Sequence, residues 1–207
     1  QDALKFSKYK KRIQVISSDD FSNSRIFRNK TYINNFCKKF KNINISIIEI
    51  HNRPEYAKIL KKSFPNSKII LTYHNDPQNL RGSINPDERI ELLSICTEIV
   101  FISQWIKKRF FTNIKNIKNN NKIIYHGVNK KKNINQSKKK IQILFVGKLN
   151  ENKGYDIFVE TAEKFKKINS DWKFIAIGNE TRKKIFPSKD IVDEIGYKSN
   201  KEVLKYY

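Results

Sequence analysis

The chain alternates short apolar runs with segments whose apolar residues recur at helical spacing. The apolar runs predict strands at residues 12–16, 45–50, 68–73, 98–102, 122–125, 141–147, 172–178 and 190–195. The segments with helical spacing predict helices at residues 29–40, 54–64, 85–96, 104–111, 154–169 and from 200 onward. Regular alternation of strand and helix favours parallel sheets joined by right-handed crossovers. The sequence therefore predicts an α/β fold with parallel sheets.

Two of the predicted helices begin at clear capping residues. Asn85 precedes Pro86 and two acidic residues, which is a typical helix start. Ser103 directly follows the strand predicted at 98–102 and precedes a helix. We interpret Ser103 as a helix cap rather than as a nucleophile.

A polar segment divides the chain. Residues 129–140 are almost wholly polar and include six lysines. Such a like-charged run resists packing and is typical of a linker. We therefore predict two Rossmann-like domains, at residues 1–128 and 141–207. Because the chain begins at Gln1, holds no methionine and ends within a helical pattern, we expect both domains to be incomplete.

The net charge of +23 has two interpretations. Residues 1–128 carry 24 basic and 10 acidic side chains, and the rest of the chain carries 19 and 10. A charge spread in this way can attract nucleic acid or an anionic membrane surface. However, Lys, Ile and Asn together make up 91 of the 207 residues, so a compositional bias also explains the charge.

The two cysteines lie in segments of apolar periodicity and predict buried thiols rather than a disulfide. Free thiols favour a reducing cytoplasm. We therefore expect a cytoplasmic protein, with association at a membrane surface left open.

The loop after the strand at 141–147 predicts a site for a phosphate-bearing ligand. The apolar run ends at Gly147, two lysines follow at Lys148 and Lys153, and Gly154 opens the next helix. That helix has apolar residues at helical spacing, namely Ile157, Phe158, Ala162, Phe165 and Ile168. Ligands of open α/β folds bind at the carboxyl edge of the sheet, where glycine lets them approach the backbone. Two ammonium groups beside a helix N-terminus suit phosphate.

Each of the three histidines directly follows a predicted strand. His51, His74 and His126 should therefore lie at the carboxyl edge of the sheet, where ligands bind. Taken singly, each histidine can also be a loop residue satisfied by backbone hydrogen bonds. His74 has the most polar surroundings, because Asn75 and Asp76 follow it. The sequence lacks a zinc-binding pattern, a Gly-x-Ser-x-Gly motif, a P-loop and Gly-x-Gly-x-x-Gly, which disfavours kinases, simple NTPases and dehydrogenases.

Several segments, taken in order, resemble retaining glycosyltransferases of the GT-B type, family 4. Residues 143–156 resemble the start of the donor domain, where Lys148 replaces the usual arginine and Lys153 matches the family's lysine. Further similarity lies in the strand-Thr-x-His step at 71–74, Ile102-Ser103, the segment 125–129, the strand at 172–178 and the segment 192–207 with its Gly196-Tyr197 loop.

This resemblance implies a GT-B fold and transfer of a sugar, such as a hexosyl group, from a nucleotide-sugar donor to a hydroxyl acceptor. In the family, Gly147, Lys148 and Lys153 would bind the donor diphosphate between the two domains. His74 would face the reaction centre, and Gly196 and Tyr197 would meet the nucleobase. We expect no metal and no resident cofactor, because the lysines would carry the charge.

The resemblance also bears on partners. It implies a nucleotide-sugar donor, a sugar acceptor and no nucleic acid. The positive charge favours a lipid-linked acceptor in cell-envelope polysaccharide synthesis and peripheral contact with an anionic membrane, although the compositional bias also explains that charge. The family's Gly-rich first loop would precede Gln1 and its paired glutamates would follow Tyr207, so this fragment can be inactive alone. Two alternatives remain open, a basic nucleic-acid-binding α/β protein and a non-catalytic remnant of the same fold.

Overall fold

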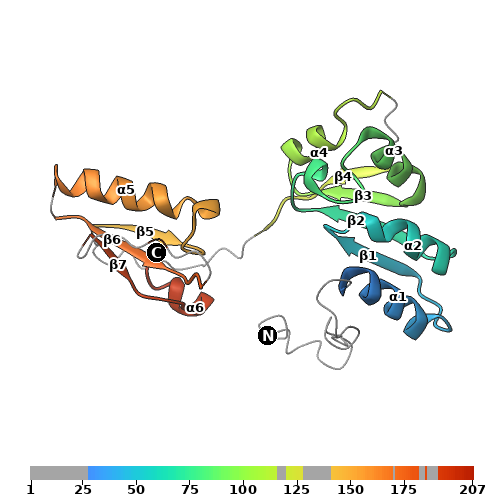
Figure 1. The fold of residues 1–207 in the computed structure, drawn as a ribbon, viewed down its shortest axis with the longest axis horizontal. Coiled ribbons are helices and arrows are strands. Elements are labelled where there is room, and N and C mark those ends of the chain that lie inside the picture. The colour runs from blue at the N-terminus through green and yellow to red at the C-terminus, as the bar shows by residue number, and fades with distance from the viewer. Residues whose placement is uncertain (1–27, 116–119, 128–140, 170, 182–184, 186–190) are drawn as a thin grey trace. The chain divides into compact units, whose positions relative to one another are not determined.

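The computed structural model describes residues 28–115, 120–127, 141–169, 171–181, 185 and 191–207 (Figure 1). The chain divides into two compact units, which we call unit 1 (Gln1–Asn129) and unit 2 (Lys130–Tyr207). The strand predicted at 12–16 and the linker predicted at 129–140 lie outside the described residues.

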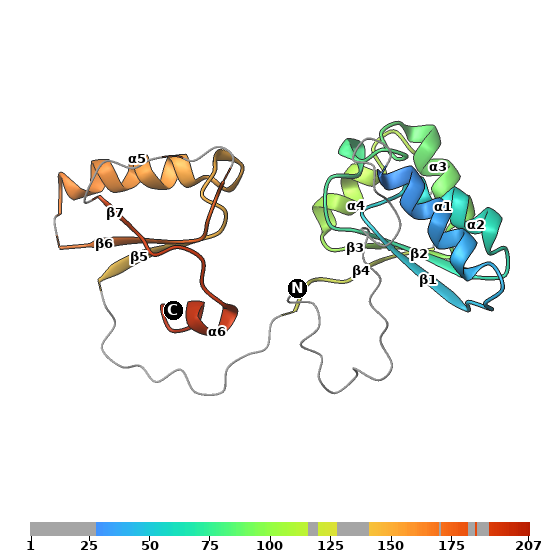
Figure 2. The ribbon, with the colours of Figure 1, turned by 60° about the horizontal axis from the view of Figure 1, so that its bottom comes forward.

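Unit 1 is built on a sheet of four parallel strands. Its order is β1 (Ile47–His51), β2 (Lys68–Tyr73), β3 (Glu98–Phe101) and β4 (Asn121–Ile123). The helices are α1 (Arg28–Phe40), α2 (Glu55–Ser63), α3 (Pro86–Ile95) and α4 (Gln104–Phe110), with a short 3-10 helix η4 (Pro77–Asn79). Helix α2 lies beside α1 (Figure 2). Because all four strands run the same way, their carboxyl ends meet at one edge.

The core of unit 1 lies between this sheet and its helices. Strands buried on both faces are continuous apolar runs, and the consecutive residues Ile99, Val100 and Phe101 of β3 are all buried. Aromatic rings fill the space between the sheet and α4, where Tyr73, Phe101 and Phe110 contact one another.

Unit 2 carries a second parallel sheet. Its order is β5 (Gln142–Val146), β6 (Lys173–Ile177) and β7 (Val192–Glu194). The 3-10 helix η5 (Glu151–Lys153) and helix α5 (Tyr155–Lys166) follow β5, and α6 (Asn200–Val203) follows β7. The predicted α/β fold with two sets of parallel strands is confirmed.

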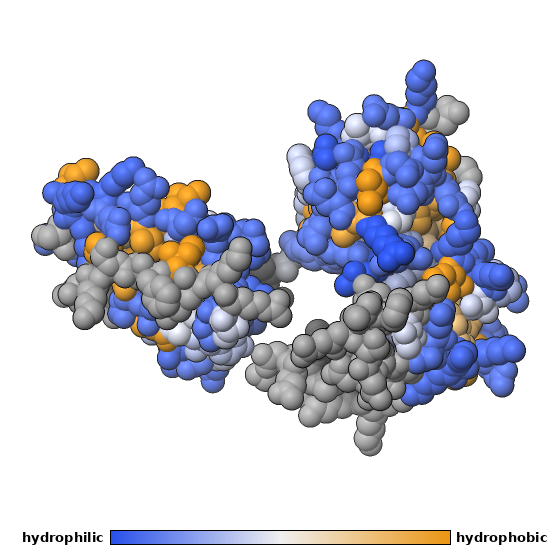
Figure 3. Space-filling view, in the orientation of Figure 1, coloured by the Kyte–Doolittle hydropathy of each residue, from blue (hydrophilic) through white to orange (hydrophobic). Residues whose placement is uncertain are grey.

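The predicted buried face of α5 is partly wrong. Tyr155, Val159 and Ala162 are buried, whereas Ile157 is 63% exposed. Residue 157 comes two positions after Tyr155, about 200° around the helix, so it points away from the sheet. Ile168 is 85% exposed because the helix ends at Lys166. Hydrophobic side chains accordingly reach the visible surface of unit 2 near α5 (Figure 3).

Both predicted helix caps are confirmed. The Asn85 side chain accepts a hydrogen bond from the Glu88 N–H, and the Glu88 carboxylate accepts one from the Asn85 N–H, which completes a capping box. Ser103 Oγ accepts from the Ile106 N–H at 3.2 Å.

The cysteines are free thiols, as predicted. Cys96 is buried, and burial raises the pKa of its thiol to about 12. Cys37 is half-buried. In the part of the chain that the structure describes, every helix is too short or too polar to cross a bilayer.

Candidate functional site

Three glycines follow the three strands of unit 2 and line one edge of its sheet. Gly147 and Gly178 come directly after β5 and β6, and Gly196 comes two residues after β7. The Gly147 N–H donates to the Ile177 carbonyl at 3.0 Å, and the Gly178 N–H donates to the Gly196 carbonyl at 3.0 Å. We call Gly147, Gly178 and Gly196 the glycine edge.

Each position of the glycine edge has its own steric character. A Cβ on Gly178 would overlap the carbonyl group of Gly147, so no side chain fits there. Gly196 has a φ of +73°, in the left-handed region that favours glycine. At Gly147 a Cβ would meet only the Phe145 ring at 3.6 Å and Lys153 Cγ at 3.9 Å. Gly178 was not among the predicted site residues, although the strand at 172–178 ended on it.

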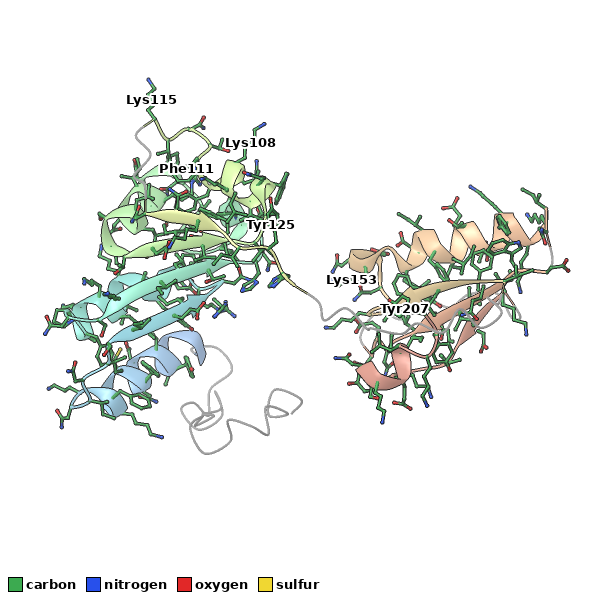
Figure 4. All side chains as sticks on the ribbon, turned by 180° about the vertical axis from the view of Figure 1, so that it is seen from behind. Lys108, Phe111, Lys115, Tyr125, Lys153 and Tyr207 are labelled. Atoms are coloured by element: carbon green, nitrogen blue, oxygen red, sulfur yellow. The ribbon has the colours of Figure 1, made fainter. Side chains whose placement is uncertain are left out.

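The lysine predicted to bind phosphate lies against this edge. Lys153 ends η5, its N–H donates to the Asn150 carbonyl at 3.1 Å, and its Cγ lies 3.9 Å from the point where a Cβ on Gly147 would stand. Figure 4 labels Lys153 on the loop that leads into α5. Lys148 is exposed one residue after Gly147. Among the described residues, neither ammonium group is paired with a carboxylate. The structure thus places the Lys153 side chain beside Gly147 and Lys148 on the same loop.

Two further residues hold this loop in place and were not predicted. Asn150 Nδ2 donates to Glu180 Oε2 at 2.7 Å, beyond the end of β6. Tyr155 is fully buried, and its hydroxyl donates to Glu194 Oε1 at 2.6 Å on β7. Burial and the neighbouring carboxylate of Glu194 both raise the pKa of Tyr155, which therefore stays protonated. These bonds tie the loop after β5 to the two other strands.

The predicted nucleobase loop lies after β7. Tyr197 is 70% exposed and directly follows Gly196. The loop precedes α6, whose cap Ser199 forms a capping box with Glu202. Exposure leaves the Tyr197 ring accessible to a ligand.

The three histidines meet at the carboxyl edge of the sheet in unit 1. His51 ends β1, His74 directly follows β2, and His126 comes three residues after β4. Nδ1 of His51 lies 2.8 Å from Nε2 of His74, and Nδ1 of His74 lies 3.1 Å from Nε2 of His126. The rings stack with centroids 5.1 and 5.2 Å apart. The predicted edge position is confirmed, and we call these residues the histidine row.

Polar residues of β1 and its loop anchor the row. Asn52, at a φ of +52°, accepts hydrogen bonds through Oδ1 from the N–H groups of His74 (2.7 Å) and Asn75 (3.2 Å). Glu49 Oε1 lies 3.3 Å from Nε2 of His51 and accepts from Thr72 Oγ1 at 3.1 Å. Neither anchor was predicted. The sequence did contain a signal for Glu49. It stands two residues before His51 in the same strand, so the two side chains lie on the same face of the sheet.

Burial and neighbouring charge set the protonation of the middle histidine. Partial burial lowers the pKa of His74, and the nearby rings of His51 and His126 lower it further. The carboxylate of Glu49 acts in the opposite direction and does not reverse the shift. His74 is therefore neutral at neutral pH.

The loop after His74 is tied to α4. Arg109 donates to Asp76 Oδ2 from Nε at 3.0 Å, and Nη2 lies 2.9 Å from the same oxygen. Asp76 Oδ1 accepts from the Gln78 N–H at 3.0 Å and so caps η4. These bonds hold in place the backbone that follows His74.

The part of the chain that holds the glycine edge matches a known family. Residues 127–207 match the model of the family described as Glycosyl transferases group 1. Among curated proteins, the chain is 24% identical over 152 residues to the putative glycosyltransferase YtcC of Bacillus subtilis (strain 168). That match covers 65% of this chain and 37% of YtcC.

Solved structures share the fold. Anabaena Alr3699/HepE in complex with UDP-glucose matches with a TM-score of 0.56 and 11% identity, covering 86% of this chain and 55% of HepE. TarM, a protein of S. aureus, matches with a TM-score of 0.62 and 14% identity over 86% of this chain and 38% of TarM. The chain therefore has the fold of GT-B glycosyltransferases, and it spans about 40–55% of the length of these relatives.

Proposed function

We propose that this chain is part of a glycosyltransferase that moves a sugar from a nucleotide-sugar donor to a hydroxyl acceptor. The observation that carries the proposal is the position of the Lys153 side chain beside Gly147 at the glycine edge, within the segment that matches the family. The fold shared with HepE, whose structures contain UDP-glucose or UDP, supports the same assignment. The family match supports it over the nucleic-acid-binding alternative.

The proposed chemistry follows from charge and backbone access. When the bond between the sugar and the nucleotide breaks, the diphosphate keeps the electron pair and gains negative charge. The ammonium groups of Lys148 and Lys153 would stabilise that charge without a metal ion. The glycine edge would let the diphosphate approach the backbone, and Gly196 and Tyr197 would contact the nucleobase. We further propose a hexosyl group and retention of anomeric configuration, on the family resemblance.

Unit 1 would supply the acceptor side, with His74 contacting the reacting sugar. Its basic surface is compatible with a lipid-linked acceptor at an anionic membrane in the cytoplasm and with a product of the cell envelope. Fold by itself does not confer activity, so a non-catalytic relative of the same fold is the second candidate.

A binding titration tests the nucleotide site directly. We expect the chain to bind UDP or GDP in isothermal titration calorimetry. Lys153→Ala should weaken binding roughly tenfold, as loss of one charged contact costs about 1.5 kcal/mol. The matched control is Lys173→Ala, since Lys173 is an exposed lysine at the opposite end of the same sheet. Equal affinity of both variants would remove the role of Lys153.

A second titration addresses the nucleic-acid alternative. Binding to duplex DNA at two salt concentrations should be weak and should lack saturation at a defined stoichiometry. Tight DNA binding that falls steeply with salt, together with no binding of UDP or GDP, would overturn the proposed function.

A further inference from the structure

The histidine row has a direction, because each contact joins Nδ1 of one ring to Nε2 of the next. Both nitrogens of His74 are engaged, one by His51 and one by His126. One end of the row faces a carboxylate, since Nε2 of His51 lies 3.3 Å from Glu49 Oε1. The opposite end is Nδ1 of His126, an exposed residue whose Nδ1 has no hydrogen-bond partner among the described residues.

The carboxylate determines which nitrogen carries each hydrogen. A neutral imidazole has one donor and one acceptor nitrogen. Nε2 of His51 lies 3.3 Å from a carboxylate oxygen, which can only accept, so we assign the hydrogen of His51 to Nε2 and leave Nδ1 as an acceptor. With that assignment His74 donates from Nε2 and accepts at Nδ1, and His126 donates from its own Nε2. The result is a lone pair on Nδ1 of His126, at the end of the row opposite Glu49.

We propose that the histidine row is a proton relay that accepts one proton from a ligand hydroxyl at Nδ1 of His126 and holds the charge at His51 beside Glu49. The hydroxyl O–H bond breaks, and its electron pair stays on the oxygen. The proton binds Nδ1 of His126, the Nε2 proton of His126 passes to Nδ1 of His74, and the Nε2 proton of His74 passes to Nδ1 of His51. His51 ends as an imidazolium beside a carboxylate, while His74 and His126 end neutral.

The short distances limit the row to one proton. Two imidazolium rings with nitrogens 2.8–3.1 Å apart would repel strongly. The groups whose charge acts on His74 are His51, His126 and Glu49. Of these three, Glu49 is the negative one, so a single positive charge in the row is most stable on the ring next to Glu49. The nitrogens face one another and do not converge on a common point, and the described residues contain no cluster arranged to hold a metal ion.

The identity of the hydroxyl rests on the proposed function, in which it belongs to the acceptor. His126 would then be a catalytic residue, and His51 and Glu49 would be positioning residues that act through it. The relay itself depends only on the geometry of unit 1, so it can be tested without any donor.

NMR spectra that correlate ring hydrogens with ring nitrogens test the relay in the whole chain. We expect all three histidines to carry their hydrogen on Nε2 when the row is neutral. As the pH is lowered, the first proton that the row takes up should be found mainly on Nδ1 of His51. Three separate, complete titrations would overturn the relay. So would a hydrogen on Nδ1 of His126 at high pH.

Variants separate the relay from a merely structural role. Glu49→Gln should move proton uptake by the row to lower pH by about one pH unit, because the charge that stabilises the imidazolium is lost. Glu98→Gln is the matched control, since Glu98 pairs with Lys122 at the start of β3 and contacts no histidine in the described structure. Unchanged backbone spectra confirm folding in both. An identical uptake in the two variants would overturn the relay, whatever the outcome of the nucleotide titrations.

Discussion

The carbonyl oxygen of Gly147 lies where a side chain on residue 178 would begin. The neighbouring strands β5 and β6 therefore end with their backbones in direct contact. Gly147 also donates its N–H to Ile177, so the two strand ends are joined as well as close. This contact forms the part of the glycine edge beside which the Lys153 side chain lies.

Gly178→Ala should destabilise unit 2. The added Cβ would overlap backbone, which cannot rotate away as a flexible side chain can. We expect a loss of about 2–3 kcal/mol in the free energy of unfolding, measured by urea denaturation followed through NMR signals of unit 2.

Gly147→Ala is the matched variant with the opposite expectation. Its Cβ would meet the Phe145 ring at 3.6 Å, which is ordinary contact. Stability should change by no more than about 0.5 kcal/mol, while nucleotide affinity should fall because the methyl group obstructs the edge. Equal destabilisation by the two alanines would contradict this account of the glycine edge.

Asn85→Ala should weaken the start of α3. The variant loses the side-chain acceptor of the capping box, which costs about 1 kcal/mol. Asn44→Ala serves as the control, because Asn44 is exposed and caps no described helix. Urea denaturation of both variants, read from unit 1, should show a loss only for Asn85→Ala.

The Asp76–Arg109 pair should stabilise unit 1 at neutral pH and lose this effect in acid. Partial burial by itself would raise the pKa of Asp76, but hydrogen bonds from Arg109 and Gln78 outweigh it, and the net pKa lies below its ordinary value of 3.8. The contribution is therefore present above that pH and is lost as the pH falls through the folded pKa. Asp76→Asn should destabilise unit 1 at neutral pH, and the difference from the unchanged chain should shrink in acid.

A carboxylate elsewhere in unit 1 provides the comparison for Asp76. Asp87 is exposed in the first turn of α3. Asp87→Asn should cost only about 0.5 kcal/mol through the helix dipole. If Asp87→Asn lowered the free energy of unfolding as much as Asp76→Asn does, the bond between Asp76 and Arg109 would add no stability beyond that of an exposed carboxylate.

His74 should make the stability of unit 1 depend on pH near neutrality. The pKa of folded His74 lies below its ordinary value of 6.5, so the unfolded chain binds more protons as the pH drops below that value. The free energy of unfolding should be level above about pH 7 and should fall below it, by about 1.4 kcal/mol per pH unit for each extra proton bound by the unfolded chain. His74→Gln should flatten this slope. Denaturation midpoints at several pH values measure it, and an unchanged slope would contradict the shift.

Features that depend on neighbours in the chain were predicted well. The helix caps at Asn85 and Ser103 follow from local hydrogen bonding, and the strand before Gly147 follows from a continuous apolar run. Prediction failed where packing selects among similar residues. Ile157 reads as a core position by its apolarity, yet the side of α5 that faces the sheet is the one holding Tyr155 and Val159.

The sequence by itself determined the alternation of strands and helices, and with it the placement of the histidines, Gly147 and Lys153 at strand ends. The tertiary structure decided which of these residues touch. His126 reaches His74 past β3, and Gly178 meets Gly147, because strand order and register bring together residues far apart in the chain. Order and register depend on how whole apolar faces pack, a property of the assembled sheet that no short stretch of residues contains.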